Sequence, residues 1–90
     1  MRVEFDAAKD KINKGKHGIS LARAADFDYD SALYIEDDSQ DYGEVRLIAI
    51  GFLGLKLYVL VFSPRGEEAV RAIMLREANK HEMRKYDEES

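Results

Sequence analysis

Three groups of polar residues in this chain of 90 residues have the types and spacing suited to chemistry on a substrate. The first is the run Lys16-His17-Gly18, with Lys9 one or two helical turns earlier. Histidine titrates near neutral pH, so it can take or give a proton under physiological conditions. A histidine at a helix end is also often a capping or surface residue. Proton transfer and a structural role therefore both remain open for His17.

The second group consists of three arginines in or beside apolar segments: Arg46, Arg71 and Arg76. An unpaired charge is costly to bury, so each must either pair with an acid or face a groove. The acids available for pairing are Asp41, Glu44 and Glu77. The alternative is contact with phosphate, because the planar guanidinium fork matches two phosphate oxygens.

The third group lies near the C-terminus and contains His81, Glu82 and Tyr86. Asn79 and Glu82 have the spacing of a capping box, which predicts that Glu82 bonds to the backbone and has little freedom to act as a base. Tyr86 follows four residues later and shares its helix face with Glu82. We expect Tyr86 either to stack on a nucleic-acid base or to pack under the sheet.

Common cofactor motifs are missing from the sequence. It has no Gly-x-x-x-x-Gly-Lys loop, no dinucleotide fingerprint and no His-Glu-x-x-His pair. With no cysteine and two histidines, we expect no disulfide, no structural zinc and no cofactor. Two classes of function remain, namely acid–base and electrostatic work on a substrate, or binding alone.

Charge is unevenly spread around the net value of −4. Residues 26–44 carry eight acidic side chains and no basic one, whereas residues 1–25 carry six basic and three acidic side chains. An acidic run is typical of a solvated face, and the alternative is attraction of a basic protein partner. A calcium site is disfavoured, because the loop spacing and its glycine are absent.

The most apolar stretch, residues 47–62, is interrupted by Gly51, Gly54 and Lys56. It is shorter than the ~20 residues of a membrane helix, and the N-terminus lacks an apolar signal region. We therefore expect a cytoplasmic protein without a membrane partner.

The first third of the chain predicts a short strand and two helices, at residues 3–5, 6–16 and 21–26. Asp6 and Ser20 are the candidate N-caps of the two helices. Gly15 and Gly18 are expected to mark the end of the first helix.

The rest of the chain predicts strands at residues 31–36, 44–51, 55–62 and 70–75. Turns are expected at residues 51–54 and 63–66, where glycine and proline occur. A last helix would start near Asn79 and end near Tyr86, and residues 87–90 would form a frayed tail.

We therefore expect a single α+β domain over residues 1–90, with two layers: an N-terminal β-α-α unit, an antiparallel sheet of about four strands and a C-terminal helix. We assign to one face of the central hairpin Leu47, Ala49, Leu57, Val59 and Val61, and to the other Ile48, Ile50, Tyr58, Leu60 and Phe62. A sheet that is apolar on both faces must be covered on both sides. The N-terminal helices would cover one face, and a ligand or partner part of the other.

Several short motifs follow one another in an order that spans residues 3 to 86. They are Phe5-Asp6 with Lys9, Lys16-His17-Gly18-Ile19, Tyr42-Gly43-Glu44 with Arg46, Ile48-Ala49-Ile50-Gly51, Arg71, Arg76-Glu77-Ala78-Asn79, Glu82 and Tyr86. In this order and spacing the chain resembles the BrnT-type ribonuclease toxins. Met74 and Glu77 depart from the family pattern, in which a small or hydroxylated residue and a basic residue are usual at these positions.

The resemblance implies a compact RelE-like fold and a role in a bacterial type II toxin–antitoxin system. Such a toxin inhibits translation by cleaving RNA without a metal ion. Its implied partner is a BrnA-type antitoxin with a ribbon-helix-helix DNA-binding part. The complex would bind operator DNA only through this antitoxin.

The resemblance also implies roles for individual residues. Arg71 and Arg76 would hold phosphate, and His17 or Lys16 would transfer protons. The substrate groove would be lined by Lys9, Arg46 and Tyr86. Metal-free RNA cleavage needs a base, an acid and cations around phosphorus, and the assignment of base and acid stays open.

Two other functions remain as alternatives. One is a non-catalytic BrnT-like interaction protein that binds a basic protein partner. The other is a DNA-binding module, which the negative net charge disfavours.

Overall fold

The computed structural model describes residues 1–89 and contains a five-stranded sheet with helices on both faces. In chain order the elements are β1 (Arg2–Glu4), α1 (Ala7–His17), the 3₁₀ helix η1 (Leu21–Asp26), β2 (Leu33–Glu36), β3 (Leu47–Leu53), β4 (Lys56–Pro64), β5 (Ala69–Glu77) and α2 (Lys80–Glu89). The α+β class, the β-α-α start and the C-terminal helix are confirmed.

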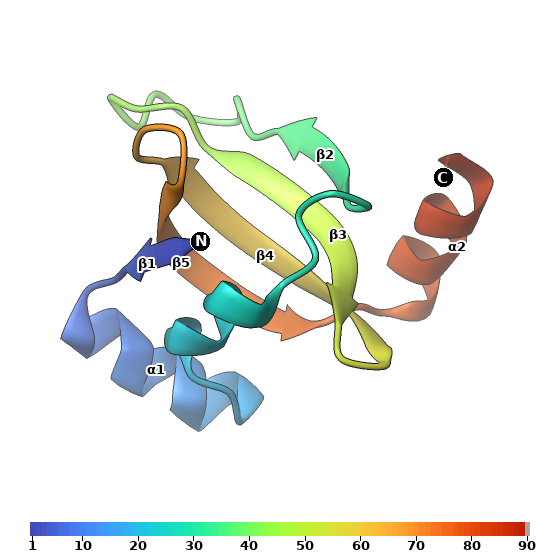
Figure 1. Cartoon of the computed structure of the whole chain (residues 1–90), viewed down its shortest axis with the longest axis horizontal. Coiled ribbons are helices and arrows are strands. Elements are labelled where there is room, and N and C mark those ends of the chain that lie inside the picture. The colour runs from blue at the N-terminus through green and yellow to red at the C-terminus, as the bar shows by residue number, and fades with distance from the viewer. Residues whose placement is uncertain (90) are drawn as a thin grey trace.

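The strand order in the sheet is β1-β5-β4-β3-β2 (Figure 1). Strands β2 to β5 form the expected antiparallel meander, and β1 adds a fifth strand parallel to β5. Because β1 pairs only with residues 69–71, no strand in the described part of the chain pairs with the second half of β5 on that side. Helix α1 lies along this free part of β5.

The two N-terminal helices begin at the predicted caps. The Asp6 carboxylate accepts hydrogen bonds from the amides of Ala8 and Lys9, at 2.8 and 3.1 Å. The Ser20 hydroxyl accepts one from the Ala22 amide at 3.1 Å. Helix α1 ends at Gly18, whose φ of 71° is left-handed, so glycine is favoured there. The helix reaches His17, one residue beyond the expected end.

The turn between β3 and β4 differs from the prediction. It contains Gly54 and Leu55, and the last pair of the ladder is Leu53 with Lys56. Gly54 has a φ of 66°, which suits a two-residue hairpin turn. The predicted turn at residues 51–54 is therefore wrong, and Gly51 is an internal residue of β3.

The predicted division of side chains between the two faces of this hairpin is also wrong. A two-residue turn after Leu53 places odd-numbered residues of β3 opposite even-numbered residues of β4, and opposite residues share a face. One face, here called the inner face, carries Leu47, Ala49, Tyr58, Leu60 and Phe62. The outer face carries Ile48, Ile50, Leu57, Val59 and Val61.

Helices cover the two faces unequally. On the inner face, Leu21, Ala24 and Phe27 from the η1 segment pack against core residues of β4 and β5. On the outer face, Tyr86 from α2 and Ala78 from the link between β5 and α2 pack on Ile50 and Val59. The expected two layers therefore gain a partial third layer. The outer face beyond α2 is only half-buried, at Ile35, Ile48, Val61 and Met74.

The C-terminal helix starts with the predicted capping box. The Asn79 amide donates to Glu82 Oε1 and the Glu82 amide donates to Asn79 Oδ1, both at 2.9 Å. The helix continues to Glu89, three residues beyond the predicted end, so residues 87–89 are helical where a frayed tail was expected. Ser90 lies outside the described residues. No helix within residues 1–89 is long and apolar enough to cross a membrane.

Candidate active site

A bulge in β5 brings Arg71 and Arg76 to the same face of the sheet. In a regular strand, residues five positions apart point to opposite faces. Here Val61 pairs with Met74 but Phe62 pairs with Ala72, so Ile73 is an extra residue in β5. Arg71 pairs with Ser63 and Arg76 with Val59, and both of these partners belong to the outer face.

Three arginines converge on the Glu44 carboxylate at one end of this face. Arg71 Nη2 forms an ion pair with Oε2, Arg65 Nη2 lies 3.3 Å from Oε1, and Arg46 Nε lies 3.8 Å from Oε2. The predicted pairing with Glu44 is therefore present for Arg46 and Arg71. The Glu44 side chain is 19 % exposed, and the group has a formal charge of +2.

This arginine cluster has more hydrogen-bond donors than acceptors. The Nε atoms of Arg46 and Arg71 are buried, and neither has a hydrogen-bond partner within residues 1–89. The Arg46 guanidinium lies 3.8 Å from the centre of the Tyr42 ring, which is cation–π geometry. Burial raises the pKa of Glu44, but hydrogen bonding and charge from Arg71, with charge from Arg65, lower that pKa overall. Glu44 is therefore ionised at neutral pH.

Arg76 differs from Arg71 because its donors have matched acceptors. Its Nη1 and Nη2 atoms donate to the two carboxylate oxygens of Glu82 at 2.8 and 2.7 Å, and Nη1 also donates to the Glu77 carbonyl at 3.1 Å. These bonds to Glu82 raise the pKa of Arg76 and lower that of Glu82. The Glu77 side chain, an expected partner, pairs instead with Lys56 at 3.1 Å.

Helix α1 brings the other predicted cations to the free edge of β5. Lys9, Lys16 and His17 line a cavity of about 150 Å³ together with Ile73 and Met74. We call this cavity the edge groove. A smaller cavity, of about 50 Å³, joins Lys9 and Ile73 to Arg71. Four of the predicted site residues, Lys9, Lys16, His17 and Arg71, are thus neighbours along one edge.

The Asn13 side chain holds α1 in this position. Its Nδ2 donates to the carbonyls of Leu75 and Ile19 at 2.8 and 2.9 Å, and its Oδ1 accepts from the Leu75 amide at 3.2 Å. One amide side chain therefore satisfies both backbone groups of Leu75 on the free edge of β5. Both bonds to Leu75 are buried.

Tyr86 lies on α2 and is only 8 % exposed. Its hydroxyl donates to the Ser31 carbonyl at 3.1 Å, and its ring meets Phe52 edge-on at 5.7 Å between centres. Base stacking and packing against the sheet were the two alternatives for Tyr86, and in the structure its ring packs against the sheet. Tyr86 lines neither the edge groove nor the smaller cavity beside Arg71.

Residues 5–82 match the family model for the ribonuclease toxin BrnT of the type II toxin–antitoxin system. The chain belongs to this family. It is also similar to the Brucella abortus ribonuclease toxin BrnT, known from a crystal structure at 1.1 Å resolution, with 31% sequence identity and a TM-score of 0.66. That similarity covers 89% of this chain and 99% of the Brucella chain. Among curated proteins, no sequence matches this chain.

The family and the fold that the sequence motifs implied are therefore confirmed. This chain is a BrnT-type ribonuclease toxin of a type II toxin–antitoxin system, so RNA is its substrate and an antitoxin is its partner. Within residues 1–89, no cluster of three or more His, Asp or Glu side chains is arranged to bind a metal ion.

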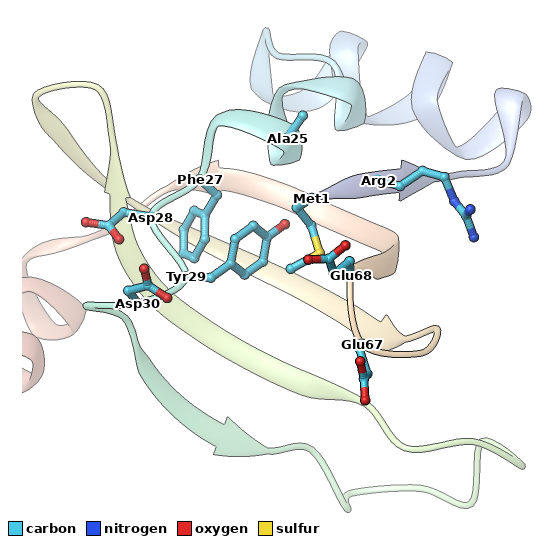
Figure 2. A pocket seen from close by; sticks show the side chains of 9 residues that line it. All are labelled: Met1, Arg2, Ala25, Phe27, Asp28, Tyr29, Asp30, Glu67 and Glu68. Carbon is cyan, nitrogen blue, oxygen red and sulfur yellow. The ribbon is translucent and has the colours of Figure 1, made fainter.

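This BrnT chain also has a cavity of about 700 Å³ that is lined by four acidic residues and one arginine, namely Asp28, Asp30, Glu67, Glu68 and Arg2. Figure 2 shows the Phe27 and Tyr29 rings side by side, with Asp28 and Asp30 beyond one end and Glu68 beyond the other. Such a surface repels RNA phosphates and attracts basic side chains. It belongs in part to the acidic run noted in the sequence.

Sequence reasoning missed Arg65 and Asn13 as contributors to this site. Arg65 was placed only in a turn, although an arginine directly after a strand is a usable signal for a site at the strand end. Nothing in the sequence marks Asn13 or the extra residue Ile73, because a bulge depends on the pairing of two strands.

Proposed function

We propose that this BrnT toxin is an endoribonuclease that cleaves RNA by transesterification without a metal ion, at the edge groove and the adjoining Arg71. One observation carries the proposal. Lys9 borders both the groove with Lys16 and His17 and the small cavity with Arg71. The cations of α1 are therefore continuous with those of the outer face, as a bound RNA strand requires.

In this mechanism a base removes the proton from a ribose 2′-hydroxyl, and the 2′-oxygen attacks the adjacent phosphorus. The bond from phosphorus to the 5′-oxygen breaks, and an acid protonates that oxygen. His17 and Lys16 are the candidates for the two proton transfers, with the order left open. Arg71 and Arg76 stabilise the additional negative charge that develops on the phosphoryl oxygens.

The other predicted site residues act around this centre. Lys9 and Arg46 bind the RNA backbone on either side of Arg71. Arg76 can bind a phosphate group once that phosphate has replaced the Glu82 carboxylate as the acceptor of its hydrogen bonds. Tyr86 supports the site by fixing α2 on the sheet, because its ring is buried.

Cleavage of a labelled RNA by purified protein tests the mechanism. Arg71→Gln should lower the cleavage rate by about 100-fold or more, the usual effect of losing one preorganised charge-stabilising donor. Arg23→Gln is the control, because Arg23 is an exposed arginine on η1 that pairs with Asp26. Wild-type cleavage should persist in EDTA. Activity that disappears in EDTA and returns with Mg²⁺ would contradict the metal-free mechanism.

In the cell, this activity would act in the cytoplasm and inhibit translation by destroying RNA. Induced expression without the antitoxin should then arrest growth, and Arg76→Ala should relieve the arrest. Pulse labelling of new protein would show whether translation stops before growth does.

We further propose that the antitoxin is a BrnA-type ribbon-helix-helix protein and that its basic side chains contact the acidic region of residues 26–44. Only the antitoxin in the complex would bind operator DNA. Asp37 accepts hydrogen bonds from Ser39 and Tyr42, so its replacement also disturbs the loop. Asp30 and Asp38 are exposed, so their replacement tests charge alone. The Asp30→Lys/Asp38→Lys double variant should weaken the complex with the antitoxin. An unchanged affinity for the antitoxin would reject this contact.

A non-catalytic interaction protein is the alternative. The observation that favours it is that Arg71 and Arg76 are both paired with carboxylates in a chain of negative net charge. Normal growth on induced expression, together with tight antitoxin binding, would support this function.

A further inference from the structure

We propose that the arginine cluster around Glu44 is a phosphate subsite for bound RNA, in which the Glu44 carboxylate occupies the phosphate position until RNA displaces it. The inference rests on the proposed RNA cleavage and adds two residues to it. Arg65 becomes a substrate-binding residue, and Glu44 becomes an internal competitor of the substrate.

The geometry of the cluster carries this inference. Arg46 directly precedes β3, Arg65 lies in the β4–β5 turn and Arg71 lies in β5, and all three point to a single carboxylate. Each of the two Glu44 oxygens has an arginine partner, as two oxygens of a phosphate would. Three cations around one monovalent carboxylate leave a formal charge of +2, so the cluster attracts a further anion such as an RNA phosphodiester, whose single negative charge is shared by two non-bridging oxygens.

The unused donors point to the same ligand. The buried Nε atoms of Arg46 and Arg71 lack any acceptor within residues 1–89, and a buried donor without a partner is unfavourable. A phosphodiester is tetrahedral, so its oxygens accept hydrogen bonds from directions that a planar carboxylate does not cover. In contrast, Arg76 and Glu82 form a closed pair in which both carboxylate oxygens accept from the guanidinium.

The position of the cluster fits a strand of RNA that continues into the edge groove. Arg71 borders the small cavity with Lys9, and Lys9 borders the groove with Lys16 and His17. The Arg65 side chain is 42 % exposed, so it is accessible to a ligand from solvent. A phosphate at the cluster would therefore lie next to the one proposed to react.

The experiment measures binding of a 2′-O-methyl RNA oligonucleotide, which cannot undergo transesterification, by fluorescence anisotropy at several salt concentrations. Glu44→Gln should tighten binding at least ~5-fold at low salt. Glu88→Gln, on the exposed side of α2, removes the same charge away from the cluster and should change affinity less than 2-fold.

Arg65→Gln gives a second measurement that does not alter the buried carboxylate. It should weaken binding and make the salt plot about 0.7 shallower, whereas Arg23→Gln should do neither. Unchanged or weaker binding by Glu44→Gln, or an unchanged slope for Arg65→Gln, would overturn the subsite even if wild-type protein cleaves RNA. If wild-type protein binds no RNA at all, the proposed function falls and the subsite with it.

Discussion

At the scale of single residues, the arginines of this BrnT toxin are in two different electrostatic situations. Arg71 shares one carboxylate with two other arginines, and its Nε forms no hydrogen bond within the described residues, 1–89. Arg76 forms an ion pair with the Glu82 carboxylate, and no other arginine within residues 1–89 pairs with that carboxylate. We therefore expect Arg71 to bind an additional anion more readily than Arg76, because the arginine cluster around Glu44 has guanidinium donors without acceptors and the Arg76–Glu82 pair is closed.

Tyr86 provides a residue-scale prediction that separates packing from base stacking. Tyr86→Phe keeps the ring but removes the hydrogen bond to the Ser31 carbonyl, so the free energy of unfolding should fall by about 1 kcal/mol. RNA affinity should stay unchanged, because the ring is buried against Phe52. Urea denaturation and RNA binding measure the two effects. A large loss of affinity without a loss of stability would mean that the hydroxyl contacts RNA.

Asn13 provides a second prediction at this scale. Asn13→Ala removes three hydrogen bonds and leaves the amide and carbonyl of Leu75 unpaired, so the free energy of unfolding should fall by roughly 2–4 kcal/mol. Lys11→Ala, at an exposed position of the same helix, is the control and should change the free energy of unfolding by less than about 0.5 kcal/mol. A loss of the same size in both variants would mean that the Asn13 amide does not hold α1 on β5.

At the scale of elements, the two glycines Gly51 and Gly15 should respond oppositely to alanine. A Cβ on Gly51 would lie 2.8 Å from Phe27 Cζ and 2.9 Å from Ala32 Cβ, so Gly51→Ala should cost about 1–3 kcal/mol of stability through overpacking. A Cβ on Gly15 meets nothing within 4 Å, so Gly15→Ala should stabilise α1 by roughly 0.5–1 kcal/mol. Thermal melting of both variants tests this, and a tolerated Gly51→Ala would place β3 further from Phe27.

Local signals allowed the prediction of most elements and of the antiparallel meander, but not of the β3–β4 register or of the pairing of β1 with β5. Asp6, Ser20 and Asn79 were predicted as caps because capping depends on nearby residues, and all three act as caps. The β3–β4 turn was placed wrongly because the choice between Gly51 and Gly54 depends on the space that Phe27 occupies.

The candidate site shows the same limit. Arg46, Arg71 and Arg76 could be selected from their residue type and their place in or beside apolar segments, whereas Arg65 was missed. That Arg71 and Arg76 share a face could not be predicted, because it depends on the extra residue Ile73 in a ladder with β4. The convergence of Arg46, Arg65 and Arg71 on Glu44 also depends on contacts between segments far apart in the sequence.

At the scale of the whole molecule, charge is divided between two regions. The edge groove and the arginine cluster are cationic, and the cavity beside Phe27 and Tyr29 is acidic. The acidic loop before β3 adjoins the arginine cluster, because the Asp37 amide donates to the Arg46 carbonyl at 2.8 Å and the Tyr42 ring lies against the Arg46 guanidinium. A basic antitoxin bound to this loop would therefore lie next to RNA bound at the arginine cluster.

Acid should destabilise the whole molecule through its buried carboxylates. The hydrogen bond from the Leu21 amide is the largest cause that lowers the pKa of Asp10, and the hydrogen bond from Arg76 is the largest cause that lowers the pKa of Glu82. The pKa of Glu44 is also lowered overall. Each folded pKa lies below the unfolded value, so the stability that these groups add is present above that value and is lost as pH falls through the folded pKa. The free energy of unfolding should therefore be nearly constant near neutral pH and decrease below about pH 4.5.

Denaturant unfolding at a series of pH values measures this dependence. Glu82→Gln should lower stability at pH 7 and make the decrease in acid smaller, because one of the titrating groups is gone. An identical acid dependence in the variant and the wild type would show that the Arg76–Glu82 pair does not contribute to it.

The Asn13 amide has a consequence for self-association. Strand edges with free amide and carbonyl groups can add a strand from another molecule, which leads to aggregation or domain swapping. Beyond β1, the edge of β5 would offer such groups at Leu75, and Asn13 satisfies both of them from within the same chain. The side chain that holds α1 on β5 thus also occupies backbone groups through which the sheet of a neighbouring copy would pair.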